Sequence, residues 1–234
     1  MNRICFNCIK KIMGKRMGTV LKDGSIMFKD QESAIKYGIQ RCRSSVTREN
    51  PFERGISIKG SRALNEIDGK SGNIDIHNTS EIMIHSHPDT YERGCTTALS
   101  EGDYDFFIKN KNIKKIIAVN SKGETYEMEK IPGFDFSKVK TSETFSDFGI
   151  KLRRTLFGGN DVPAEQRELL ERCIKNKDLD TYYEEFWPKY VRNMYSSMST
   201  LPKHIVDKTH EFWVKYGEEF GVRVKTNFSN FVGK

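Results

Sequence analysis

Two histidines separated by one residue are the side chains in this chain that point most directly to a chemical function. His85 and His87 follow a run in which Ile82 and Ile84 alternate with other residues, so the run predicts a β-strand, which Pro88 ends. Side chains two residues apart on an extended strand point to the same face of a sheet. Both imidazoles can therefore reach one metal ion.

A carboxylate at the start of a helix completes a set of three ligands. Ser100 is a natural N-cap for a helix predicted over about residues 101–110, and Asp103 falls in its first turn. The loop 88–99 is long enough to bring this helix back over the end of the strand. Two neutral imidazoles and one carboxylate are a known ligand set for catalytic zinc, with water in the fourth position. Zinc lowers the pKa of that water to about 7, so it acts as hydroxide at neutral pH.

The string His85-Ser86-His87-Pro88, followed by a Ser-x-x-Asp helix start, resembles the signature of the JAB1/MPN/JAMM metallopeptidases. The resemblance covers about residues 17–130. In that family the two histidines and the aspartate bind zinc, and the serine, here Ser100, stabilises the oxyanion. The resemblance implies a zinc-dependent hydrolase that cleaves a peptide or isopeptide bond, with a protein or peptide, such as a ubiquitin-like protein, as its substrate.

The same family requires an upstream glutamate as general base. It usually starts a strand after the first long helix, in a pattern like Glu-x-x-Gly-x-x-x-Gly. Glu53 opens a similar stretch, residues 53–60, although the first glycine comes one residue earlier than in the commonest form. We therefore expect Glu53 to be the base. Glu66 is the alternative because it is nearer the histidines in sequence, and Glu49 and Glu81 are weaker candidates.

The segment between the second histidine and the serine is longer than in many eukaryotic members of the family. Its extra stretch, residues 89–95, is expected to lie beside the metal, where it contacts substrate or covers the site. Cys95 belongs to this stretch. Its thiol could reach the metal, and the alternative is that Cys95 is an ordinary loop residue. Cys5 and Cys8 have the spacing of half a zinc knuckle, but no second pair completes it.

The charge and composition of the chain indicate which kinds of partner and which cellular location to expect. The formal net charge is +7, and residues 1–60 carry 13 Lys and Arg against 5 Asp and Glu. No aromatic-interleaved nucleic-acid motif accompanies this charge, so a solvated surface is favoured over nucleic-acid binding. No signal peptide and no run of membrane-spanning length is present, and the cysteines are odd in number. A reducing, cytoplasmic location is the expectation.

The order of the predicted elements indicates an α+β fold, in which a mixed sheet similar to the JAB1/MPN domain is flanked by helices and followed by a helical extension. Residues 60–72 are polar and contain glycines, which predicts a loop. Strands or hairpin arms are expected at 17–21, 25–28, 53–60, 74–76, 82–84, 115–119, 124–129 and 222–232. Helices are expected at 31–48, 101–110, 141–157, 163–176, 179–196, with a kink at Pro188, and 202–220.

Three regions follow from this order: a basic segment 1–16, a metallopeptidase-like domain 17–132 and a mainly helical region 133–234. Two other classes compete with an enzyme. One is a non-catalytic scaffold or binding protein on the same MPN fold, and the other is a DNA-associated protein similar to the bacterial RadC-like group. The enzyme is favoured because inactive relatives usually lose the metal ligands, and this chain has all three.

Overall fold

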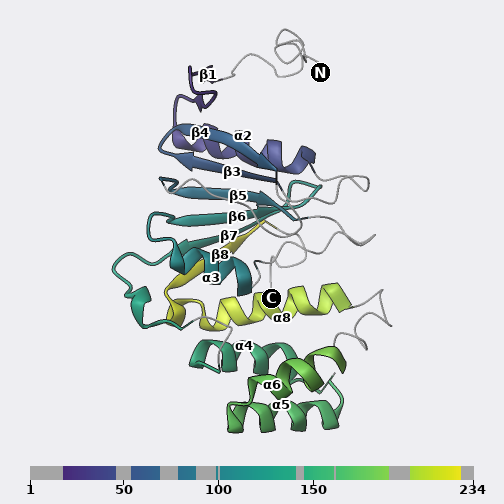
Figure 1. Cartoon of the computed structure of the whole chain (residues 1–234). Coiled ribbons are helices and arrows are strands. Elements are labelled where there is room, and N and C mark those ends of the chain that lie inside the picture. The colour runs from purple at the N-terminus through teal and green to yellow at the C-terminus, as the bar shows by residue number, and fades with distance from the viewer. Residues whose placement is uncertain are drawn as a thin grey trace.

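The computed structural model describes residues 18–45, 54–68, 79–87, 99, 101–140, 145–160, 162–189 and 201–227. In these ranges the chain forms an eight-stranded mixed sheet with helices against both faces, which confirms the expected α+β class (Figure 1). The strand order is β1-β2-β4-β3-β5-β6-β7-β8. β5 and β6 pair in parallel, and the other neighbouring strands described pair antiparallel.

The strands are β1 Thr19–Val20, β2 Ile26–Met27, β3 Arg54–Lys59, β4 Arg62–Asp68, β5 Ile82–Ser86, β6 Lys115–Val119, β7 Thr125–Lys130 and β8 Val222–Thr226. The α-helices are α2 Gln31–Ser45, α3 Glu101–Lys109, α4 Asp147–Phe157, α5 Ala164–Asn176, α6 Leu179–Thr181 and α8 Leu201–Tyr216. Short 3₁₀ helices lie at η1 Phe136–Lys138 and η3 Glu218–Phe220, and a π-helical turn, η2 Tyr182–Phe186, comes just before Pro188.

One region that was expected to be a loop is a strand in the structure. Residues 62–68, expected in a loop, form the strand β4, which lies between β2 and β3 in the sheet. Gly60, with a φ of +55°, turns the chain back after β3, and Ala63 is buried on one face of the new strand. Pairing on both sides stabilises a strand whose own residues are mostly polar, so local composition was a poor guide. The strand expected at 74–76 lies outside the described residues.

The two faces of the sheet bury different clusters. α2 covers one face, where Ala34 and Cys42 pack on Ile56, Ile58 and Ile84. A side chain at Gly38 would place its Cβ 2.5 Å from Ile84 Cδ1, so the glycine allows α2 to approach β5 closely. Because successive residues of a strand point to opposite faces, the neighbours of Ile84 in β5, Met83 and His85, point away from α2.

The other face of the sheet shares its core with the C-terminal helices. Met83 of β5 and Phe107 of α3 belong to one cluster with Phe148 of α4 and Trp213 of α8. α8 lies between the sheet and α4, with α5 and α6 farther out (Figure 1). Residues from both sides of Pro132 therefore form one core, while the division at residue 132 stays a prediction. No described helix combines the length and hydropathy that a bilayer crossing requires.

The glycine that precedes β8 should tolerate substitution worse than another glycine of the same conformation. Gly221 and Gly133 have φ angles of +77° and +80°, which cost a residue with a Cβ about 1–2 kcal/mol. A Cβ at residue 221 would lie 2.3 Å from Phe134 Cδ1, whereas one at residue 133 would have no heavy atom within 4 Å. Overpacking adds about 1–3 kcal/mol. Chemical denaturation should show a larger loss for Gly221→Ala than for Gly133→Ala, and equal losses would contradict this.

Candidate metal centre

The parallel pairing of β5 and β6 brings the three predicted metal ligands to one end of the sheet. Lys115, the first residue of β6, pairs with Ile82, the first residue of β5. α3 ends shortly before Lys115, so its C-terminus lies near the start of β5 and its N-terminus near the end of β5, as in other parallel crossovers. His85 is near the end of β5, His87 follows it, and Asp103 is in the first turn of α3.

The ligand atoms of these three residues converge on one point. His85 Nε2 is 2.9 Å from His87 Nε2 and 3.2 Å from Asp103 Oδ1. His87 Nε2 is 3.8 Å from Asp103 Oδ2. Tetrahedral zinc with bonds of about 2.0–2.1 Å holds its ligand atoms about 3.3 Å apart. The observed separations lie on both sides of that value, so the group could hold a metal ion.

Burial also suits a metal centre. The side chains of His85, His87 and Asp103 are 2 %, 12 % and 18 % exposed. A carboxylate at such low exposure is stabilised by positive charge nearby, because burial of a negative charge is costly. A divalent cation at this point could add such charge, and the partial exposure of Asp103 leaves a side from which a further ligand can approach.

The two residues that pair with His85 on the neighbouring strands are small. Gly55 of β3 and Ala118 of β6 lie directly opposite His85 on its two sides. Residues opposite one another share a face of the sheet, so both flank the imidazole. This space around His85 was not predicted, because it depends on pairings between distant strands, although the glycine is visible in the stretch that follows Glu53.

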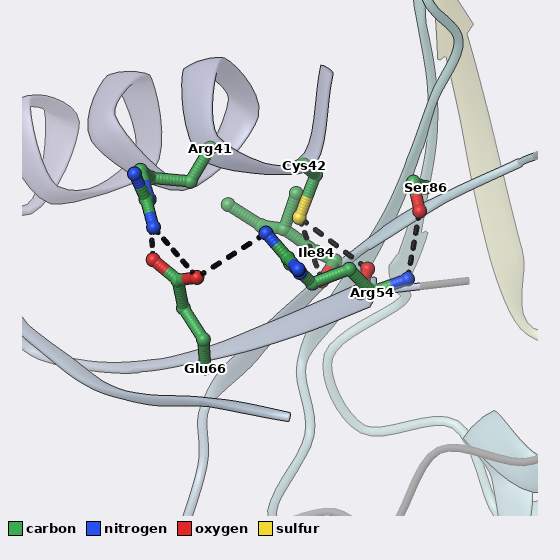
Figure 2. A network of polar contacts seen from close by, with 6 residues as sticks. All are labelled: Arg41, Cys42, Arg54, Glu66, Ile84 and Ser86. Carbon is green, nitrogen blue, oxygen red and sulfur yellow. Dashed lines mark hydrogen bonds and ion pairs between the residues drawn. The ribbon is translucent and has the colours of Figure 1, made fainter. Parts of the chain in front are cut away.

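The backbone between the two histidines is held from both sides. The His87 N–H donates to the Val119 carbonyl oxygen at 2.9 Å and so extends the contact with β6 beyond the end of β5. On the other side, the Arg54 backbone N–H donates to Ser86 Oγ at 2.7 Å (Figure 2). Ser86 is fully buried, so this bond is shielded from water. The segment that carries both imidazoles is therefore fixed to β3 and to β6.

Glu66, the alternative general base, lies on the wrong face of the sheet. It pairs with Ile56, whose side chain packs against α2, while His85 points to the opposite face. Its carboxylate accepts hydrogen bonds from the Arg41 guanidinium, one of them 2.9 Å long, and is 3.7 Å from Arg54 Nη1 (Figure 2). Glu66 therefore belongs to a cluster of ion pairs between α2 and the sheet.

Glu81 is also remote from the metal group. It precedes β5 and is four residues before His85, about 13 Å along a strand. The Gly60 N–H and the Lys114 ammonium, 3.0 Å and 3.3 Å from its carboxylate, hold the pKa of Glu81 below its usual range. Glu53, Ser100 and Glu49, like Cys5, Cys8, Cys95 and residues 89–95, lie outside the described residues.

In comparisons with known proteins, no family model matches this chain, and no curated protein or solved structure shows significant similarity to it. The conclusion that His85, His87 and Asp103 could hold a metal ion therefore rests on their own geometry and burial.

Purified protein should carry about one zinc ion per chain, as expected for one set of three protein ligands. Loss of a group that merely orients a ligand costs about 10- to 100-fold in metal affinity, so removal of a ligand by His87→Ala should cost at least as much. His210→Ala is the matched control, because His210 lies on α8 and contacts the Tyr126 hydroxyl. Elemental analysis after dialysis measures the metal content. Equal metal in wild type and His87→Ala would place the ion elsewhere.

Proposed function

We propose that this chain is a zinc-dependent hydrolase of the JAB1/MPN/JAMM type that cleaves a peptide or isopeptide bond. The observation that carries the proposal is the convergence of His85, His87 and Asp103 at the end of β5. The mixed sheet, with α2 on one face and α3 as a crossover on the other, is compatible with the fold that this family implies. Two imidazoles and a carboxylate suit zinc in particular.

Bound zinc would supply a Lewis acid that polarises a carbonyl group and lowers the pKa of water to about 7. We assign the general base to Glu53, which would accept the proton of the attacking water and pass it to the leaving amine. The place of Glu53 in the sequence supports this choice, because it is two residues before Gly55 of β3, which lies opposite His85 in the sheet.

Ser100 is the proposed hydrogen-bond donor to the oxyanion. In the sequence it stands between Leu99, which is fully buried, and the start of α3, three residues before Asp103. The proposed substrate is a protein or peptide, and a ubiquitin-like fusion is the first to test.

A reducing, cytoplasmic setting belongs to the same proposal. Cys42 and Cys173 are buried free thiols, and burial raises the pKa of Cys42 to about 12. Such a thiol is a poor nucleophile and a poor metal ligand at neutral pH. Cys42 packs against the sheet from α2, on the face away from His85, so it has no part in the proposed chemistry.

Glu53→Gln should keep zinc and stability but lose turnover by roughly a hundredfold or more, the scale of a positioned proton carrier. Glu66→Gln is the matched control, because it removes a carboxylate of the same type on the opposite face and should keep most of the turnover. The assay is cleavage of a ubiquitin-like fusion before chelation, after chelation and after zinc is restored. If Glu66→Gln loses turnover and Glu53→Gln does not, the assignment of the base is wrong.

A further inference from the structure

The position of Asp103 depends on how α3 is held against the sheet. At its C-terminal end, α3 is fixed by the Lys130 ammonium, which donates to the Asn110 carbonyl oxygen at 2.7 Å. The N-terminal end of α3 carries Asp103, whose carboxylate must come within about 3 Å of His85 Nε2, as it does at 3.2 Å. Two contacts at this end come from the C-terminal region of the chain.

The first of these contacts is made by Trp213 of α8. Its Nε1–H donates to the carbonyl oxygen of Leu99 at 3.2 Å, and both residues are almost completely buried. Leu99 is two residues before the first residue of α3. The indole N–H can only donate, and a buried donor or carbonyl that loses its partner carries a large desolvation penalty. This hydrogen bond therefore ties the entry of α3 to α8.

The second contact is made by Tyr104, which follows Asp103 in the sequence. Its hydroxyl donates to the Phe220 carbonyl oxygen at 2.8 Å, and burial raises the pKa of Tyr104, so the hydroxyl stays protonated. Its ring packs against Phe148 of α4 and Trp213 of α8, with centroids 4.7 Å and 5.0 Å away. The partner groups of Tyr104 thus come from three C-terminal elements, α4, α8 and η3.

Tyr104 and Asp103 together fix the rotation of α3 about its axis. Consecutive residues of an α-helix point about 100° apart. When Tyr104 is held in the C-terminal core, the direction of Asp103 is set, and in this structure it is the direction of His85. A small rotation or shift of α3 would move the carboxylate away from the two imidazoles.

We propose that Trp213 and Tyr104 are positioning residues of the metal centre, through which the C-terminal region determines the affinity for metal. The inference rests on the proposed metal centre but not on the proposed hydrolysis. It assigns a role to the C-terminal region of this chain: α4, α8 and η3 form the support that holds the third ligand in place. The same contacts locate Leu99, the residue before the proposed oxyanion donor.

The test compares Tyr104→Phe and Trp213→Phe with the control Tyr126→Phe in the full-length chain. Each change keeps an aromatic ring and removes a buried hydrogen-bond donor. Tyr126 is the matched control because its buried hydroxyl also contacts α8, at His210 Nδ1, 3.0 Å away, but it lies on β7 and does not hold α3. The readouts are the dissociation constant for Zn²⁺, measured by competition with a chromogenic chelator, and the free energy of unfolding of the metal-free protein.

Tyr104→Phe and Trp213→Phe should weaken zinc binding by about tenfold, the lower end of the range for groups that orient a metal ligand. Tyr126→Phe should change it by less than about twofold, although its loss of stability should be similar to that of Tyr104→Phe, because each removes one buried hydroxyl. The inference would be overturned if both test variants bound zinc as tightly as the wild type. It would also be overturned if, in all three variants, the loss of zinc affinity were proportional to the loss in free energy of unfolding. A wild-type protein that binds no zinc would overturn the metal centre itself, and this inference with it.

Discussion

The parallel pairing of β5 with β6 is the constraint on which the proposed site depends. Parallel neighbours need a crossover connection, and here the crossover contains α3, which starts near the end of β5. β3 is antiparallel to β5, so the start of β3 lies at that same end of the sheet. Three stretches of chain that are distant in sequence thus meet where His85 and His87 lie. β5 and the residue that follows it carry the two imidazoles, and α3 carries the carboxylate. The proposed base, Glu53, precedes β3 in the sequence.

The carboxylates on the two faces of the sheet have different neighbours. On the α2 face, the carboxylate of Glu66 is compensated by the guanidinium groups of Arg41 and Arg54 within the protein itself. On the opposite face, the carboxylate of Asp103 lies beside the imidazoles of His85 and His87. A divalent cation bound there would add positive charge to this group. The carboxylate of Glu66 therefore stabilises the fold, whereas the carboxylate of Asp103 is suited to bind a metal.

The sequence predicted the parts of this arrangement that local pattern controls. α2, β5, α3 and the β6–β7 hairpin follow from hydrophobic spacing, and the His-x-His and Ser-x-x-Asp motifs identified the group that the structure brings together. β4 was missed because its polar residues gain their strand conformation from pairing with β2 and β3. The position of Glu66 could not be predicted from the sequence, because it depends on the register of β3 against β4. The bond from Trp213 to Leu99 joins residues 114 positions apart, and no local pattern predicts it.

We propose that a metal ion binds to nitrogen and oxygen ligands of His85, His87 and Asp103. X-ray absorption at the zinc edge of the zinc-loaded protein is the decisive measurement, because it distinguishes sulfur from lighter ligands by distance. We expect a first shell of nitrogen and oxygen at about 2.0–2.1 Å, with the outer-ring scattering of two imidazoles and no sulfur. A first shell of sulfur at about 2.3 Å without the imidazole scattering would contradict it, because the metal would then be bound by cysteines and not by these three residues.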